Sequence, residues 1–549
     1  MSALHNIAPL EIFSRHANET PNKVYLRQPI KGEIKNYTWS DSYEQTLRLA
    51  QGLLSMGLNK GDKVAILANN CAEWFISDYA LSAAGLISAP IYSTAGESVI
   101  DYVLKHCDAK AIIVGDIAKP EFAKNAIPSD VITIGMSTST LDWQYNITDL
   151  VSNNSPLEDI HQPNMDETFS IVYTSGSTGA PKGVVLTYEN ACFTGSTAAG
   201  LCRQGSNERF LSYLPLAHVA ERALVQYTSL YVGATVTFNE SIETFIDDLR
   251  SAEVTSFFSV PRLWIKFQSQ VLANMPQRKL SLLLSIPVVG TIVKNKIKAQ
   301  LGFSNCGLFG SGSAPISPSI LDWYHKLGID ISEGWGLSET FGLATTNYPF
   351  QANKLGTIGH AFDGFDVKIS EQGEVLVKGG GVFKEYFKNP ETTAETFTED
   401  GYMRTGDKAD IDNDGFLTIT GRVKDLFKTA KGKYIAPVPI ESKLAANILI
   451  EQLCVMGNGL PKAMVAIVLS EEVAKDMSKE EISQSLIDTI TEVNDQIEKH
   501  EAIGGAMIVA EPWTINNSLL TPTMKIKRDV LEDKYLPLFE KQTDDVFWQ

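Results

Sequence analysis

Short apolar runs alternate with helix-period stretches along most of the chain, and this alternation constrains the fold more than any other feature. Residues 62–68 and 87–91 are typical of buried strands, and residues 71–85 between them have the period of a helix. Residues 98–107 are again helical and residues 110–114 strand-like. Strands that alternate with helices form parallel sheets covered by helices. The sequence therefore predicts an α/β fold.

The pattern changes along the chain in a way that predicts two domains. The strand–helix rhythm recurs from residue 168 to about residue 335, whereas short strands punctuated by glycines, such as residues 373–378 and 415–420, indicate a small antiparallel β unit. Beyond Arg422 a polar, lysine-rich stretch leads to mixed strands and helices. Because 549 residues exceed one hydrophobic core, we predict a large N-terminal domain, residues 1–423, and a small α+β C-terminal domain, residues 424–549.

Charge and cysteine content exclude several classes of protein. A net charge of −18 argues against nucleic acid as a partner, because phosphate backbones attract basic faces. The six cysteines are scattered with no CxxC pair, which argues against zinc and a disulfide framework and favours a reducing compartment. The N-terminal stretch has no signal-peptide pattern. We expect a cytoplasmic protein, and the sequence does not indicate its oligomeric state.

One apolar run, residues 280–293, leaves two interpretations open. It is short for a bilayer span, which needs about 20 residues, and it contains Pro287 and Gly290. A buried or linking segment is the favoured interpretation. The alternative is an interfacial patch that gives the protein a peripheral membrane contact, although the acidic composition gives no reason to expect a basic membrane-binding surface.

The most informative segment is the loop YTSGSTGAPKG at residues 173–183. Its glycines and hydroxyl side chains can form an anion-binding nest, and Lys182 can reach a phosphate. It is not a Walker A loop, because Gly183 rather than Ser or Thr follows the lysine and a strand-like run comes next. The alternative from composition alone is a surface turn rich in Gly and Ser.

This loop resembles the signature of the adenylate-forming, or AMP-binding, superfamily, which includes acyl-CoA synthetases, luciferases and the adenylation domains of peptide synthetases. Several further segments match in order over nearly the whole chain, and three of them look most like the long-chain fatty acyl-CoA synthetase branch: LPLAHVAER, the lysine-rich turn and TPTMKIKR. The matching segments are LPLAHVAER (214–222), GSGSAP (310–315), EGWGLSET (333–340), YMRTGD (402–407), GRVKDLFKTAKGKYIAP (421–437) and TPTMKIKR (521–528).

The resemblance implies the adenylate-forming enzyme fold and a long-chain fatty acid–CoA ligase. Such an enzyme uses ATP and Mg²⁺ to convert a fatty acid to acyl-AMP with release of pyrophosphate, and then transfers the acyl group to coenzyme A. One alternative is an adenylating enzyme that acts on another carboxylic acid or loads a carrier protein. An alternative of another class is a catalytically silent nucleotide-binding regulatory protein.

The resemblance also assigns residues to the nucleotide and the metal. Glu339 and the Thr178 hydroxyl would hold Mg²⁺, whose preference is for oxygen ligands. Asp407 would bind the ribose hydroxyls and Arg422 the ribose or α-phosphate, the alternative for both being a turn salt bridge. The phosphate-binding residues would be Thr174, Ser175, Gly176, Ser177, Thr178, Gly179 and Lys182; the adenine and α-phosphate wall would be Ser313, Ala314, Pro315, Glu333, Gly334, Trp335 and Ser338. Many relatives carry tyrosine at the position of Trp335, whose indole would stack on adenine equally well.

Lys525 is the predicted catalytic lysine, and His218 the predicted positioning residue beside the carboxylate and α-phosphate. Most relatives have this lysine in an SGK triplet, whereas here it lies in PTMKIK, so Lys527 competes for the role. The small domain would swing at Lys424, bringing either Lys525 or the turn that contains Lys428 and Tyr434 to the site. The acyl chain would enter a tunnel lined by residues 260–264, 310–311 and 341–343, with Trp264 as a stop or gate.

Overall fold

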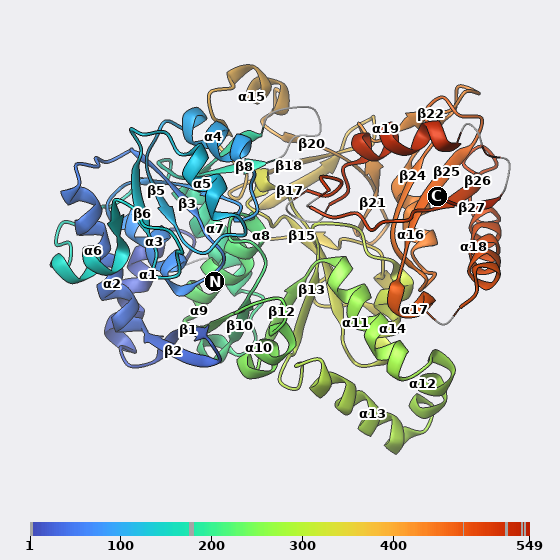
Figure 1. The fold of residues 1–549 in the computed structure, drawn as a ribbon, viewed down its shortest axis with the longest axis horizontal. Coiled ribbons are helices and arrows are strands. Elements are labelled where there is room, and N and C mark those ends of the chain that lie inside the picture. The colour runs from blue at the N-terminus through green and yellow to red at the C-terminus, as the bar shows by residue number, and fades with distance from the viewer. Residues whose placement is uncertain are drawn as a thin grey trace.

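The computed structural model describes residues 4–174, 181–475, 477–515, 517–521, 525–539, 542 and 545–549. Figure 1 shows the N-terminal and central elements gathered on one side and the C-terminal elements, in orange and red, on the other. The α/β prediction is correct: the largest sheet has the strand order β19-β9-β8-β4-β3-β5-β6-β7. From β8 to β7 its neighbouring strands are parallel, and β9 and β19 extend it antiparallel. Its strands are β3 (Lys63–Leu67), β4 (Ile87–Ile91), β5 (Ala109–Val114), β6 (Ile132–Gly135), β7 (Tyr145–Asn146), β8 (Thr168–Thr174), β9 (Lys182–Thr187) and β19 (Glu385–Tyr386).

Two further sheets of the N-terminal part are mixed, with three parallel strands each and antiparallel strands added at an edge. Their orders are β10-β11-β1-β2 and β12-β13-β14-β15-β16. Their strands are β1 (Val24–Ile30), β2 (Glu33–Thr38), β10 (Arg209–Ser212), β11 (Thr235–Phe238), β12 (Ser256–Ser259), β13 (Leu308–Ser311), β14 (Ile331–Trp335), β15 (Thr345–Thr346) and β16 (His360–Ala361).

The glycine-punctuated region forms the predicted small antiparallel unit. Its sheet has the order β17-β18-β20-β21, and every pairing in it is antiparallel. The pairing of β20 with β21 places Asp407 directly opposite Arg422. The strands are β17 (Phe365–Ile369), β18 (Glu374–Gly379), β20 (Met403–Ile411) and β21 (Leu417–Arg422).

Helices cover these sheets, and several begin where the sequence supplies a cap. Thr38 and Asp41 form a capping box at the start of α2, which satisfies backbone N–H groups that the helix itself leaves free. Helix α3 is buried along nearly all its length because the apolar side chains surround it. The helices of this part are α1 (Pro9–Glu19), α2 (Trp39–Ser55), α3 (Ala72–Ala83), α4 (Glu97–His106), α5 (Pro120–Ala126), α6 (Ile147–Asn153), α7 (Tyr188–Ala199), α8 (Val219–Glu221), α9 (Thr228–Val232), α10 (Phe245–Ala252), α11 (Pro261–Asn274), α12 (Gln277–Leu284), α13 (Pro287–Gln300), α14 (Pro318–Lys326) and α15 (Pro390–Thr396), with a π-helical segment at Arg222–Tyr227 between α8 and α9.

The elements after Arg422 build their own sheets and cores. A two-stranded ribbon is followed by a sheet of order β24-β25-β26-β27, packed between two apolar clusters. Ser478 and Glu481 form a capping box at the start of α18. The elements are β22 (Phe427–Lys428), β23 (Tyr434–Ile435), α16 (Pro437–Leu444), β24 (Ile450–Met456), β25 (Ala463–Leu469), α17 (Glu471–Ala474), α18 (Lys479–Asn494), β26 (Ile503–Ile508), α19 (Arg528–Phe539) and β27 (Val546–Trp548).

The apolar run at residues 280–293 connects β12 to β13 as a linking segment, but most of it is not buried. It forms the facing parts of α12 and α13, and four of its large apolar side chains are exposed. Within the described part of the chain, no helix is long and apolar enough to cross a bilayer.

Candidate active site

The predicted nucleotide wall lies at the carboxyl ends of two neighbouring parallel strands. Strand β13 leads to Ser313–Pro315, β14 ends with Glu333, Gly334 and Trp335, and Ser311 pairs with Glu333. Ligands of open α/β sheets bind outside such strand ends. Gly312 is required here by close approach, because a Cβ atom at this position would lie 2.7 Å from the Gly334 carbonyl oxygen. The structure thus brings both parts of the predicted wall together.

Glu333 differs from the other residues of this wall. Its side chain is buried, and its carboxylate accepts a hydrogen bond of 2.9 Å from the backbone N–H of Gly356. Burial raises the pKa of Glu333 to about 8. The carboxyl group of Glu333 therefore holds the backbone at Gly356. Ser338 begins a short 3₁₀ turn, Ser338–Thr340, that carries Glu339.

Asp407 is the best-held side chain of the site. It is buried, Arg422 Nε donates to its Oδ1 at 2.7 Å, and Trp335 Nε1 donates to its Oδ2 at 2.9 Å. The charge of Asp407, which outweighs burial, raises the pKa of Arg422. A carboxylate has about four lone-pair positions, so Asp407 retains acceptor capacity for hydroxyl groups. Asp407 thus orients the indole of Trp335, which lies 72 residues earlier in the sequence.

Lys182 and Glu339 meet at a residue that sequence reasoning missed, Tyr386. The Tyr386 hydroxyl donates to Glu339 Oε1 at 2.7 Å, and Lys182 Nζ lies 4.9 Å from the centre of its ring. Burial and the neighbouring Glu339 carboxylate raise the pKa of Tyr386. Thr174 and Lys182 are paired across β8 and β9, so both ends of the phosphate loop are placed. Ser175, Gly176, Ser177, Thr178 and Gly179 lie outside the described residues.

His218 and Lys525 come together from distant parts of the chain. The pKa of His218 is lowered to about 3, first by burial and then by the positive charge of Lys525. Its ring is therefore neutral at physiological pH. Because Nδ1 accepts a hydrogen bond of 3.2 Å from the Ala220 N–H, the ring proton is on Nε2, which can donate. This geometry suits the positioning role that the sequence suggested, and does not suit a base.

Of the two competing lysines, Lys525 is the one whose charge acts on His218. The pKa of Lys525 is lowered, first by burial and then by the charge of Arg422, while the charges of Asp407 and Glu339 raise it. The Lys525 side chain nevertheless keeps contact with solvent. The N–H of Lys525 donates to Thr521 Oγ1 at 3.1 Å, and Thr521 N–H donates to the Lys525 carbonyl at 2.8 Å. These two hydrogen bonds hold Lys525 beside Thr521.

The loop that carries His218 is held by Asn70 and Glu221, neither of which the sequence analysis singled out. Asn70 Nδ2 donates to the Leu214 carbonyl at 2.6 Å, and its Oδ1 accepts from the Leu216 N–H at 3.1 Å. Glu221 Oε1 accepts from the Tyr213 N–H at 3.0 Å. Burial raises the pKa of Glu221 to about 8. Asn70 follows a strand of the large sheet, so this loop is tied to that sheet.

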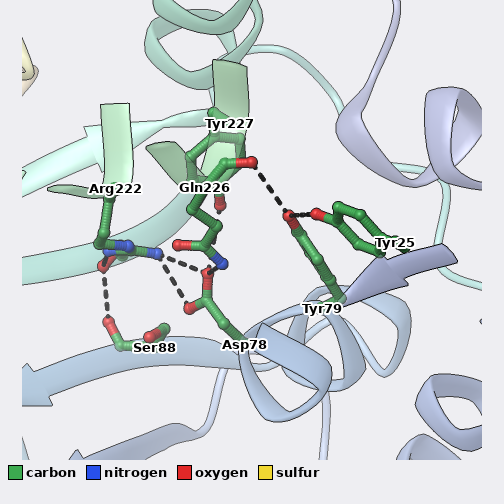
Figure 2. Close-up of polar contacts among 8 residues, drawn as sticks. Tyr25, Asp78, Tyr79, Ser88, Arg222, Gln226 and Tyr227 are labelled. Atoms are coloured by element: carbon green, nitrogen blue, oxygen red, sulfur yellow. Dashed lines mark hydrogen bonds and ion pairs between the residues drawn. The ribbon is translucent and has the colours of Figure 1, made fainter. Parts of the chain in front are cut away.

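Figure 2 shows a second attachment of the same segment, built around the buried ion pair of Arg222 with Asp78. Arg222 Nη2 donates to the Asp78 oxygens at 2.9 and 2.8 Å, and Gln226 and Tyr227 donate to Oδ2 at 3.0 and 3.3 Å. Arg222 Nη1 also donates to Ser170 Oγ, on the strand β8 that leads to the phosphate loop, at 2.7 Å. Burial is the largest single influence and lowers the pKa of Arg222, but the charges and hydrogen bonds of Asp78 and Tyr227 together outweigh it and the pKa is raised.

Lys424, Lys428 and Tyr434 follow Arg422 in the chain. All three are exposed, and Lys428 Nζ lies 5.6 Å from the centre of the Tyr434 ring across the ribbon β22–β23. Gly432 turns the ribbon with a φ of 77°, which favours glycine. The structure therefore holds Lys525, but not the turn between β22 and β23, toward Asp407 and Glu339.

An apolar cavity of about 90 Å³ lies beside the predicted nucleotide wall. Gly310, Gly334 and Leu343 belong to its lining, as do Cys202 and Tyr348. Trp264 does not belong to the described lining. Its side chain is fully buried in an aromatic cluster, with Nε1 3.3 Å from the Gly310 carbonyl oxygen, so the prediction that it stops or gates the acyl chain is not supported.

Comparison with known proteins places this arrangement in a family. The profile of the AMP-binding enzymes matches residues 13–387, and that of the AMP-binding enzyme C-terminal domain matches residues 424–545. A long-chain-fatty-acid–CoA ligase of Mycobacterium bovis is 31% identical over 95% of this chain and 94% of its own length. A peroxisomal long chain acyl-CoA synthetase of Arabidopsis thaliana is 29% identical over 93% and 83%.

Solved structures show the same fold at lower identity. An anthranilate CoA ligase in complex with anthranoyl-AMP has a TM-score of 0.82 at 20% identity, covering 97% of this chain and 98% of its own. The A domain of a carboxylic acid reductase from Segniliparus rugosus, in complex with AMP and a carboxylic acid, has a TM-score of 0.80 at 18% identity, covering 98% and 95%. Over both of its parts, the chain belongs to the family of AMP-binding enzymes.

Proposed function

We propose that the protein is a long-chain fatty acid–CoA ligase that forms acyl-AMP from a fatty acid and ATP, releases pyrophosphate, and transfers the acyl group to coenzyme A. The observation that carries this proposal is the apolar cavity beside the nucleotide wall. Its lining is mostly aliphatic and aromatic side chains, which suit an alkyl chain. The names of the most similar curated relatives, fatty acyl-CoA ligases, support the same substrate class.

In the first half-reaction, a carboxylate oxygen attacks the α-phosphorus of ATP, and the bond to the bridging oxygen of pyrophosphate breaks. Both reactants are negatively charged, so cations and hydrogen-bond donors that face the α-phosphate supply much of the stabilisation of the transition state. Lys525 and Arg422 would provide the cations, and His218 Nε2–H would orient an oxygen of the carboxylate or phosphate. Asp407 would hold the ribose hydroxyl groups.

Mg²⁺ fits the acidic end of this cluster. Oε1 of Glu339 accepts the hydrogen bond from Tyr386, and among the described residues no hydrogen-bond donor contacts Oε2, which can therefore serve as a hard oxygen ligand. Thr178, the other proposed ligand, lies outside the described residues. With the ion bound, charge on the phosphates would be partly neutralised. Lys182, above Tyr386, would contact the β- and γ-phosphates, together with residues 174–179.

The second half-reaction would use the same cleft after a domain rotation. We propose residues 1–423 and 424–549 as the two domains, with Lys424 as the hinge. In the second arrangement the turn with Lys428 and Tyr434 would replace Lys525 and guide the thiol of coenzyme A to the acyl carbonyl. The thiol sulfur forms the thioester bond, AMP leaves, and the thiol proton is released.

The test is product analysis with Mg-ATP, coenzyme A and fatty acids from short to very long chain. Acyl-CoA and AMP in equal amounts, with the highest kcat/KM at long chains, are the expected result. AMP or pyrophosphate without thioester would show that the adenylate passes to another acceptor, such as a carrier protein. ATP binding without turnover of any acid would replace the proposal with a regulatory nucleotide-binding protein.

A further inference from the structure

Helices α12 and α13 form a hairpin that projects from the body of the molecule (Figure 1). Its base is anchored: Leu280 and Ile297 are buried, and Trp323 Nε1 on α14 donates to Gln277 Oε1 at 2.9 Å. The two helices approach closely at Gly290, where a Cβ atom would lie 2.8 Å from the Leu284 carbonyl oxygen. The hairpin is therefore a defined structural element.

The tip of this hairpin, defined as Leu282, Ile286, Val288 and Ile292, is apolar and exposed. The exposed fractions of these residues are 66%, 44%, 72% and 62%. Val288 and Ile292 lie one helical turn apart and so share a face of α13. Leu282 and Ile286 flank the turn between the helices. A contiguous exposed apolar surface of this kind marks a site of interaction.

The segment that contains the hairpin is positively charged, whereas the whole chain is negatively charged. No aspartate or glutamate occurs between Glu253 and Asp322, although the whole chain carries 65 acidic residues and a net charge of −18. Arg278, Lys279 and Lys296 on the hairpin are exposed. The basic residues between Glu253 and Asp322 are Arg262, Lys266, Arg278, Lys279, Lys294, Lys296 and Lys298.

We propose that the tip of the α12–α13 hairpin docks the protein on an anionic lipid bilayer. The apolar side chains would enter the boundary between headgroups and acyl chains, while the lysines and arginines meet the lipid phosphates. The apolar tip matches the acyl chains of the bilayer, and the cations on the same hairpin match its anionic headgroups. A symmetric contact between the hairpins of two copies would instead bring two positive surfaces together, so the charge pattern favours lipid over that contact.

The hairpin lies in the connection between two strands that line the apolar cavity. Helices α11, α12 and α13 form the connection between β12 and β13, and Phe257, Phe258, Phe309 and Gly310 of these strands line the apolar cavity. Docking would hold that cavity near the lipid in which long-chain fatty acids dissolve. This consequence rests on the proposed function, whereas the docking itself does not.

The experiment is sedimentation of the full chain, without ATP or fatty acid, with phosphatidylcholine vesicles that either contain or lack phosphatidylglycerol. One variant replaces the tip residues (Leu282→Ser, Ile286→Ser, Val288→Ser and Ile292→Ser), and another reverses charge (Lys294→Glu and Lys296→Glu). The matched control is Ile242→Ser, since Ile242 is 85% exposed but stands in an acidic loop outside the hairpin. Unchanged thermal unfolding midpoints establish that the variants fold.

The wild type and the Ile242→Ser control are expected to pellet with anionic vesicles, with a partition at least about tenfold above that with phosphatidylcholine alone. The tip variant should lose this binding, and the charge-reversal variant should lose on the order of tenfold in partition. Equal binding of wild type and tip variant, or no binding to anionic vesicles, would overturn the proposal. So would a wild-type dimer in light scattering that the tip variant alone converts to monomer. Because no catalysis is measured, failure of the proposed function would leave these outcomes unaffected.

Discussion

The buried pair of Arg222 and Asp78 permits a prediction whose magnitude follows from the structure. Both side chains are essentially inaccessible to solvent, at 0% and 1% exposure. Replacing one partner leaves the other charge buried without its counter-ion, which costs about 3–5 kcal/mol in free energy of unfolding. We therefore expect Arg222→Met and Asp78→Leu each to destabilise the protein by about that amount.

The double variant should cost much less than the sum of the two single variants. Replacing both members of a buried pair by apolar side chains removes the uncompensated charge. The existing network is also incompletely satisfied, since Arg222 Nε and Gln226 Oε1 have no partner among the described residues. We expect a coupling free energy of about 2 kcal/mol or more between the two positions.

The assay is urea unfolding followed by tryptophan fluorescence, which suits this site because the Trp74 ring lies 5.6 Å from the Arg222 guanidinium. Arg15→Met is the control, because the Arg15–Glu11 pair is exposed and such pairs contribute about 0–1 kcal/mol. Single variants at Arg222 and Asp78 that cost under about 1 kcal/mol, or strictly additive costs in the double variant, would refute the reasoning.

Four further predictions concern the site. Lys525→Ala should abolish adenylate formation yet spare thioester formation from supplied acyl-AMP; retention of both half-reactions would contradict the assignment. His218 should remain neutral down to about pH 4 by NMR. Because the unfolded chain binds its proton near pH 6.5 and the folded protein near pH 3, acidification between these values should remove stability; a ring that titrates near pH 6.5 in the folded protein would contradict this. Tyr386→Phe frees Glu339 from its hydrogen bond and should weaken Mg²⁺ affinity in isothermal titration with ATP by about 10-fold or more, whereas unchanged affinity would separate Tyr386 from the metal. Cys202→Phe fills part of the cavity and should lower kcat/KM for the longest acids by about 10-fold or more while Cys202→Ser does not; equal loss at all chain lengths would argue against this lining.

Much of the fold could be predicted because local pattern decides it. The strands predicted at residues 62–68 and 87–91 are β3 (Lys63–Leu67) and β4 (Ile87–Ile91), and the helix between them is α3 (Ala72–Ala83). Uninterrupted apolar runs of this length suit strands that helices cover on both faces. The same reasoning failed at residues 280–293, since periodicity shows that a segment is apolar but not what covers it.

The predicted site residues come together where they belong to motifs, as with Asp407 and Arg422, which β20 and β21 pair directly. Residues that act through these motifs could not be found in the same way. Tyr386 reaches Glu339 only because β19 joins the edge of the large sheet beside β9. Asn70 meets Leu214 across 144 residues of sequence. Such contacts are consequences of tertiary packing, and no spacing in the sequence encodes them.

Arg262 and Glu451 form an ion pair of 3.0 Å that joins α11 to the C-terminal elements. Among the described residues it is the one ion pair that joins residues 1–423 to residues 424–549, and both side chains are about one-third exposed. A pair this accessible contributes about 1 kcal/mol or less, whereas a ligand that binds one arrangement tenfold better than the other shifts their equilibrium by about 1.4 kcal/mol. The free energy of binding a reactant can thus outweigh this ion pair. In the proposed domain rotation, the bound reactant and not the ion pair would therefore decide which face of residues 424–549 is turned toward the site.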